Sequence, residues 1–256
     1  MHVARVGFAP VKGTRHASYD AVRLDRLGGL PGPVGDRAFC LVDVAARRVL
    51  KTVQNPSLVA VRSSWDGSRL TMALPSGETA TSAVATTGER IVCDYWGRPA
   101  SLDLMDGPHA ALASSYLGGD VRLAAAPPGA VVYGAPVTLV SLASLRELAD
   151  SLGRPALAEE PARFRPTVVL DDLEPWAEES WAGRTLRIGA ATVRVHAPVP
   201  RCAVIDLDPV TGVANAPLLK ALAARPDPPA PDLPFGVDAF VVTPGVVRPG
   251  DPVLVD

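Results

Sequence analysis

The segment that decides the fold reads Asp66-Gly67-Ser68-Arg69-Leu70-Thr71-Met72-Ala73-Leu74-Pro75-Ser76-Gly77. A short run of strand character, residues 69–73, stands between two turn pairs that contain glycine, which is typical of consecutive β-hairpins. Similar apolar runs recur at residues 3–8, 38–44, 58–64, 91–95 and 121–126. This dense rhythm of strands and turns favours β-barrels over alternating βαβ units. We therefore expect a mainly β (α+β) fold.

Helical patterns are few. We expect three short helices, at residues 109–117, 144–152 and 216–224. In the second, Leu145, Leu148 and Leu152 share one face, and Ser144 is placed to cap the first turn. The third is followed by residues 225–234, which contain five prolines and which we interpret as a stiff surface connector.

A change in composition near Asp106-Gly107-Pro108 predicts two domains. The first, residues 1–106, is expected to be an N-terminal β-barrel-like domain. The second, residues 107–256, is expected to be another β-barrel with a few short helices.

The composition describes a globular protein. Of the 256 residues, 48% are hydrophobic and 20% charged, which is enough apolar material for a core and argues against disorder. A net charge of −2 gives no reason to expect nucleic acid or an anionic membrane as a partner. The apolar runs are too short to span a membrane, and the N-terminus lacks the pattern of a secretory signal.

The cysteines indicate a reducing environment. Cys40, Cys93 and Cys202 are an odd number at unrelated spacings, which argues against a disulfide framework. A cytoplasmic location is therefore expected. Three thiolates also cannot fill the four positions of an ordinary iron–sulfur cluster, so electrons for any redox reaction must come from elsewhere.

No familiar catalytic signature is present. The sequence contains no GxGxxG, no Walker-type phosphate loop, no HExxH, no CxxC and no GxSxG. Three local features stand out instead: Lys12 at a turn after a strand, Arg163 and Arg165 before a strongly apolar strand, and Cys202 after Pro198-Val199-Pro200-Arg201.

Cys202 is the candidate for reactive chemistry. The neighbouring Arg201 favours its thiolate form electrostatically, and prolines 198 and 200 stiffen the loop that carries it. A thiolate on a rigid loop suits a soft-metal ligand or a sulfur nucleophile. A buried cysteine that packs as a small hydrophobe is the alternative, and it is the interpretation we give to Cys40 and Cys93.

The two arginines also allow two interpretations. Arg163 and Arg165 alternate with Phe164, so they could form the solvent face of an edge strand. Alternatively, their planar guanidinium groups could clamp a phosphate or the edge of a pterin through paired hydrogen bonds.

Taken in order, several segments resemble the MOSC domain superfamily joined to its usual N-terminal β-barrel domain. In the C-terminal half they are Phe164-Arg165-Pro166-Thr167, Arg201-Cys202, Asp208-Pro209-Val210-Thr211-Gly212, Phe235-Gly236-Val237 and Pro244-Gly245-Val246. In the N-terminal half they are Ala9-Pro10-Val11-Lys12, Gly35-Asp36-Arg37 and Gln54-Asn55-Pro56. The resemblance covers nearly the whole chain. In organisation it is similar to the mitochondrial amidoxime reducing component and to YcbX-type proteins.

This resemblance implies a molybdenum cofactor (molybdopterin) between the two domains, with Cys202 as the sulfur ligand to the metal. It implies that Lys12, Arg37 and Arg165 hold the pterin and its phosphate. The wider candidate set for cofactor binding adds Lys51, Ser141, Arg163, Thr167 and Arg201, and the candidate catalytic set is Cys202, Arg201 and Asp206. Such enzymes reduce N-hydroxylated, N-oxide or S-oxide small molecules with two electrons from a partner, here a ferredoxin- or flavoprotein-type donor.

The chain departs from the family pattern at several of these positions. Thr167 stands where relatives have asparagine, Lys51-Thr52-Val53 replaces a T-x-R segment, and Ile205 and Asp206 replace threonines. Gly13 and Phe39 also differ from the usual residues. Two other functions stay open for this reason: a metal-free persulfide carrier or sulfurtransferase acting through Cys202, and a non-catalytic carrier or structural protein.

Overall fold

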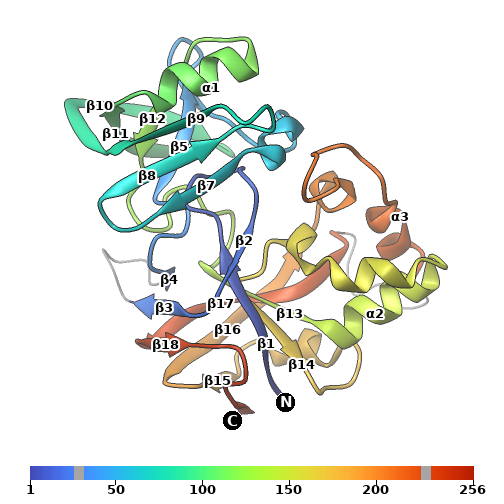
Figure 1. Cartoon of the computed structure of the whole chain (residues 1–256). Helices are drawn as coiled ribbons and strands as arrows, with labels where there is room; N and C mark the ends of the chain where they lie inside the picture. The colour runs from blue at the N-terminus through green and yellow to red at the C-terminus, as the bar shows by residue number, and fades with distance from the viewer. Residues whose placement is uncertain (26–31, 226–231) are drawn as a thin grey trace.

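The computed structural model describes residues 1–25, 32–225 and 232–256, with the backbone alone at residues 32 and 33. Strands make up 43% of the described residues. Figure 1 shows two β regions, a barrel with a small sheet beside it and a large sheet below. The mainly β fold with an N-terminal barrel is therefore confirmed. Most of the proline-rich connector at 225–234 lies outside the described residues.

The N-terminal part contains a closed five-stranded barrel and a three-stranded sheet. The barrel strands, in order around it, are β10 (Ala85–Tyr95), β11 (Arg98–Asp106), β12 (Val121–Ala125), β5 (Phe39–Asp43) and β6 (Arg48–Val49). The small sheet consists of β7 (Arg62–Trp65), β8 (Arg69–Ala73) and β9 (Thr79–Ala83).

The large sheet holds eight strands. Their order is β19 (Val253–Val255), β15 (Thr185–Ile188), β16 (Ala191–Pro200), β17 (Pro234–Thr243), β13 (Val137–Ser141), β14 (Val168–Asp171), β1 (His2–Phe8) and β2 (Ala17–Tyr19). A third sheet pairs β18 (Gly245–Val247) with β3 (Val22–Asp25) and β4 (Gly32–Pro33). Strand β1 thus belongs to the sheet built by the C-terminal half, and both termini lie at its lower end in Figure 1.

The two predicted hairpins are confirmed. Asp66-Gly67 joins β7 to β8, and Ser76-Gly77 lies between β8 and β9. The strand expected at 58–64 is wrong in its first half, because Pro56–Ala60 forms a 3₁₀ turn whose Leu58, Val59 and Ala60 are buried. Proline favours the first position of such a turn because its φ is already fixed at a helical value.

The chain does not change sheet at the expected domain boundary. Residues 107 and 108 lie between β11 and helix α1 (His109–Leu117), and β12, which follows α1, pairs with both β11 and β5 of the barrel. We propose that the change of domain falls after β12, in the segment that leads to β13.

The three expected helices are present: α1, α2 (Leu142–Ser151) and α3 (Leu218–Ala223). The cap assigned to α2 was wrong. The Ser141 side chain accepts a hydrogen bond from the backbone N–H of Ser144 at 3.3 Å, so Ser141 is the N-cap. Ser144 is buried inside the helix and donates to Glu178 at 2.9 Å. Leu145 and Leu148 are buried, as their spacing predicts.

Ser141→Ala should therefore weaken the fold and leave ligand binding unchanged. Loss of a serine cap costs about 1 kcal/mol in the free energy of unfolding. Urea unfolding of the variant measures that loss directly. Reduced ligand content with unchanged stability would contradict the assignment of Ser141 as a cap.

Among the described residues, no helix combines the length and the apolar character that crossing a membrane requires.

Candidate functional site

A cavity of about 520 Å³ lies where the barrel meets the large sheet. The barrel side contributes Lys12, Arg37, Lys51, Tyr95 and Trp96, and the sheet side contributes Arg163, Phe164, Arg165, Arg201, Cys202 and Asp238. The segment between β12 and β13 adds Tyr133, Gly134 and Ala135. Most of the residues singled out from the sequence therefore converge on one cavity, which is named the Cys202 pocket below.

Cys202 is the exposed thiol of this pocket. It follows β16 and opens the 3₁₀ turn Ala203–Asp206, so the end of a paired strand fixes its position. Cys40 and Cys93 are buried in barrel strands, as expected, and burial raises the pKa of Cys40 to about 12. Cys202 is thus the one accessible nucleophile or soft ligand among the three cysteines.

Arg201 fixes the loop that carries Cys202. Its Nε and Nη2 donate to the carbonyl oxygen of Phe235 at 2.9 and 2.6 Å, and its Nη1 donates to that of Phe164 at 2.9 Å. Burial lowers the pKa of this guanidinium to about 9. Because these bonds go to protein carbonyls on two separate segments, Arg201 acts as a positioning residue for Cys202.

Three basic side chains that influence one another's charge line the pocket. Burial, together with the charges of Arg37 and Arg165, lowers the pKa of Lys12 to about 7. Burial and the charge of Arg37 lower the pKa of Arg165 to about 10. The Asp36 carboxylate pairs with Arg37 and Asp238 lines the pocket, but the basic side chains of the lining outnumber its carboxylates. Such an arrangement attracts an anion.

Arg165 has donor capacity that the protein leaves unused. Its Nη1 donates to the carbonyl oxygen of Thr14 at 2.8 Å, but its Nη2 is buried without a hydrogen-bond partner. A buried guanidinium nitrogen without an acceptor is costly, and a bound anion would supply one. The residue also adopts a left-handed backbone conformation with φ 53°, which ends the turn Pro161–Phe164.

Arg163 lines the pocket, but its guanidinium group donates its hydrogen bonds to other groups of the protein. It donates to Glu160 at 2.6 Å, to the carbonyl oxygen of Leu207 at 2.6 Å and to Asn215 at 2.8 Å. It is 2% exposed, so the interpretation of Arg163 and Arg165 as the solvent face of an edge strand was wrong. Arg163 instead joins the turn before β14 to the segment after Cys202.

Three of the expected site residues do not line the pocket. Ser141 caps α2. The Thr167 hydroxyl accepts from the backbone of Thr138 at 3.1 Å and holds β13 beside β14. The Asp206 carboxylate accepts from the backbone N–H of Leu219 at 2.8 Å, which directs it to the start of α3. Each of these side chains satisfies a backbone group, and the structure gives none of them a contact inside the pocket.

Among the pocket residues that were not expected from the sequence are Tyr95, Trp96, Tyr133 and Asp238. Lys12 lies over the ring of Tyr95, with its Nζ 4.7 Å from the ring centre, and Lys51 lies over Trp96 at 4.2 Å. Trp96-Gly97 between two strands was the available signal, because it occupies the turn position of a hairpin. Nothing local distinguishes Tyr133 or Asp238.

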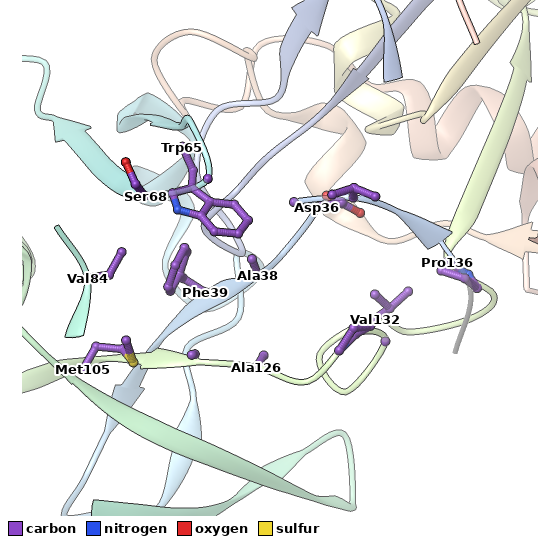
Figure 2. Close-up of a pocket in the computed structure, with 16 residues that line it drawn as sticks. Asp36, Ala38, Phe39, Trp65, Ser68, Val84, Met105, Ala126, Val132 and Pro136 are labelled. Atoms are coloured by element: carbon purple, nitrogen blue, oxygen red, sulfur yellow. The ribbon is translucent and has the colours of Figure 1, made fainter. Parts of the chain in front are cut away.

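A second cavity of about 480 Å³ lies on the other side of the segment between β12 and β13. Figure 2 shows its mainly apolar lining, including Phe39, Trp65, Val84 and Met105. Val132 lines both cavities. Asp36 lies on this side, while its ion-pair partner Arg37 lies on the side of Cys202.

The fold and the pocket define a two-part β protein that presents an exposed cysteine beside a cationic site. Comparison with known families gives a more specific assignment. The MOSC domain matches residues 115–254 and the MOSC N-terminal beta barrel domain matches residues 1–119. The chain belongs to the MOSC domain family.

Individual relatives are more distant. The chain is 25% identical to mitochondrial amidoxime-reducing component 1 of Homo sapiens, over 98% of this chain and 82% of that protein. It is 35% identical to molybdenum cofactor sulfurase 2 of Culex quinquefasciatus over an alignment of 92 residues that covers 33% of this chain and 12% of that much longer protein. The solved structure of the YuaD protein from Bacillus subtilis is similar with a TM-score of 0.45 and 12% identity, covering 99% of this chain and 93% of that one.

Proposed function

We propose that this protein binds a molybdenum cofactor in the Cys202 pocket and reduces N-hydroxylated small molecules with electrons from a separate donor. The observation that carries the proposal is the unpartnered, buried Nη2 of Arg165 beside Lys12 and Arg37, in the same cavity as the exposed Cys202 thiol. A phosphorylated pterin needs an anion site, and its metal needs a soft ligand. The residues present fit both requirements.

Each residue then has a defined task. Lys12, Arg37 and Arg165 would hold the phosphate, Cys202 would ligate the metal, and Arg201 would keep the thiolate loop in place. When bound, the group would supply two-electron chemistry that converts an N–OH to an N–H. That conversion takes up two electrons and two protons and releases one water. Because this chain has too few cysteines for an iron–sulfur cluster, we propose a ferredoxin- or flavoprotein-type donor.

Turnover tests this proposal. Protein from a molybdenum-competent host should reduce a hydroxamic acid to the amide when a chemically reduced viologen supplies electrons. The rate should depend on the molybdenum content of the preparation. Preparations that hold molybdenum and still give no product with hydroxamates, amidoximes, N-oxides or S-oxides would contradict the proposed reaction.

A persulfide carrier is the second candidate. The accessibility of Cys202 and the similarity to a protein named molybdenum cofactor sulfurase favour it. In that reaction the Cys202 thiolate would attack the outer sulfur of a donor persulfide, and the donor would leave as a thiolate. Intact mass measured after exposure to a desulfurase should then increase by one sulfur atom, and Cys202→Ser should abolish the increase.

The pH dependence of stability reports on Lys12. Its pKa of about 7 in the fold is lower than the ordinary lysine value of 10.5, so between these values the unfolded chain binds more protons than the native state. Stability of the ligand-free protein should therefore rise as the pH increases from about 7 to 9. Thermal melts in a series of buffers test this, and Lys12→Met should flatten the rise. A wild-type profile that falls across this range would contradict a buried, unpaired Lys12.

A further inference from the structure

Two exposed aromatic side chains stand in the Cys202 pocket. Trp96 is 45% and Tyr133 60% exposed, whereas the other aromatic side chains of the chain, all within the described residues, are buried or half-buried. Both line the Cys202 pocket although they come from separate segments, the β10–β11 turn and the connection from β12 to β13. Their ring centres lie 5.9 Å apart at 76°. The two residues together are named the aromatic rim below.

The backbone at Trp96 is unfavourable for a large side chain. Trp96 and Gly97 form a two-residue turn between the paired residues Tyr95 and Arg98, with φ values of 55° and 75°. A turn with two positive φ angles favours asparagine followed by glycine. The geometry of the turn therefore does not explain a tryptophan at this position. Residues held in such conformations concentrate at ligand sites, and Trp96 lines the pocket.

The charges around the rim restrict the ligand. Lys51 lies over Trp96, and Lys12, Arg37 and Arg165 line the same cavity. Because a bound phosphate would neutralise Lys12, Arg37 and Arg165, the charge that remains beside the rim is that of Lys51, which disfavours a positively charged ligand and favours a neutral or acidic one. An aromatic ring offers stacked and edge-to-face contacts to Trp96 and Tyr133, which an alkyl group cannot reproduce.

We propose that the aromatic rim determines specificity: it selects substrates that carry a planar aromatic ring and are neutral or acidic. The inference rests on the proposed function, because the ring would contact the rim while the N–OH group extends toward Cys202. The rim thus adds substrate recognition to a pocket whose floor binds an anion.

Equilibrium binding tests this inference without requiring turnover. Titration calorimetry with benzohydroxamic and acetohydroxamic acid compares a ring with a methyl group on the same reactive unit. We expect the wild-type protein to bind the aromatic acid about 10-fold more tightly, since each ring contact contributes a few-fold. Trp96→Leu and Tyr133→Leu should each reduce this ratio, whereas Trp96→Phe should retain most of it. Val92→Ala, an exposed apolar position on β10 outside the pocket, should leave the ratio unchanged.

The turn supplies a second readout. Trp96→Asn should raise the melting temperature by about 2–4 °C because it relieves the backbone, and it should also reduce the preference for the aromatic acid. A merely structural tryptophan would give the opposite change in stability.

Two results would overturn the inference: equal wild-type affinity for both acids, or loss of bound pterin from Trp96→Leu, which would assign the rim to the cofactor. A different result would separate the two proposals. If the protein holds no molybdenum but still binds the aromatic acid more tightly, and the rim substitutions reduce that preference, the proposed reaction is contradicted and the role of the rim in binding aromatic ligands is supported.

Discussion

Cys202→Ser is expected to abolish reduction of N-hydroxylated substrates. A serine hydroxyl is a hard and largely protonated ligand, whereas the cysteine supplies a soft thiolate at a position fixed by β16 and Arg201. Loss of groups outside the ligand shell already reduces metal affinity or activity by about 10- to 100-fold, and loss of the ligand itself should exceed that range. Metal content and turnover rate, measured on the same preparation, give the result.

Cys93→Ala provides the matched control. It removes a buried barrel thiol that does not line the pocket, so any loss should be in stability and not in metal content. If Cys202→Ser retained full molybdenum content and turnover, Cys202 would not be the ligand. If it retained the metal and lost only the uptake of sulfur, the persulfide function would be favoured.

Arg165→Gln should weaken cofactor retention by about 10- to 100-fold, because it removes a charged donor to the anion, a contact of about 1.5–3 kcal/mol. The ligand-free protein should change in stability by no more than about 1 kcal/mol, because Nη2 makes no hydrogen bond within the protein and Nη1 makes one. The substitution should therefore reduce cofactor binding much more than it changes the free energy of unfolding. Pterin fluorescence after dialysis measures the first, and urea unfolding measures the second.

Arg90→Gln is the control for this substitution. Arg90 forms an exposed ion pair with Asp103 on the barrel, and neither residue lines the pocket. Exposed pairs contribute little to stability. Equal pterin loss from both variants would show that general charge, and not Arg165, retains the cofactor. Arg165→Gln that kept its pterin through dialysis would also contradict the role given to Arg165.

Local sequence signals predicted the elements that depend on neighbours along the chain. The Asp66-Gly67 and Ser76-Gly77 hairpins and helix α1 lie where they were expected, because turn chemistry and helix periodicity act within a few residues. The pairing of β1 with β14 in the C-terminal sheet and of β12 with β5 in the barrel joins residues more than 70 positions apart. No local pattern encodes such pairing.

The residues of the site also divide into those that the sequence predicted correctly and those that it did not. Lys12, Arg37, Arg165 and Cys202 were singled out by the motif resemblance, and the structure brings them to one cavity. Ser141, Thr167 and Asp206 were also expected in the site, yet each satisfies a backbone N–H instead. Residue type alone does not distinguish these two uses of a short polar side chain. The aromatic rim was missed because its two members lie on distant segments.

The most direct measurement is the molybdenum and pterin content of the purified wild-type protein and of Cys202→Ser, both from a molybdenum-competent host. We expect molybdenum and pterin in near-equal amounts, approaching one per wild-type chain, and loss of the metal from the variant. Wild-type protein that contains neither molybdenum nor pterin, from a host shown to load another molybdenum enzyme, would contradict the account.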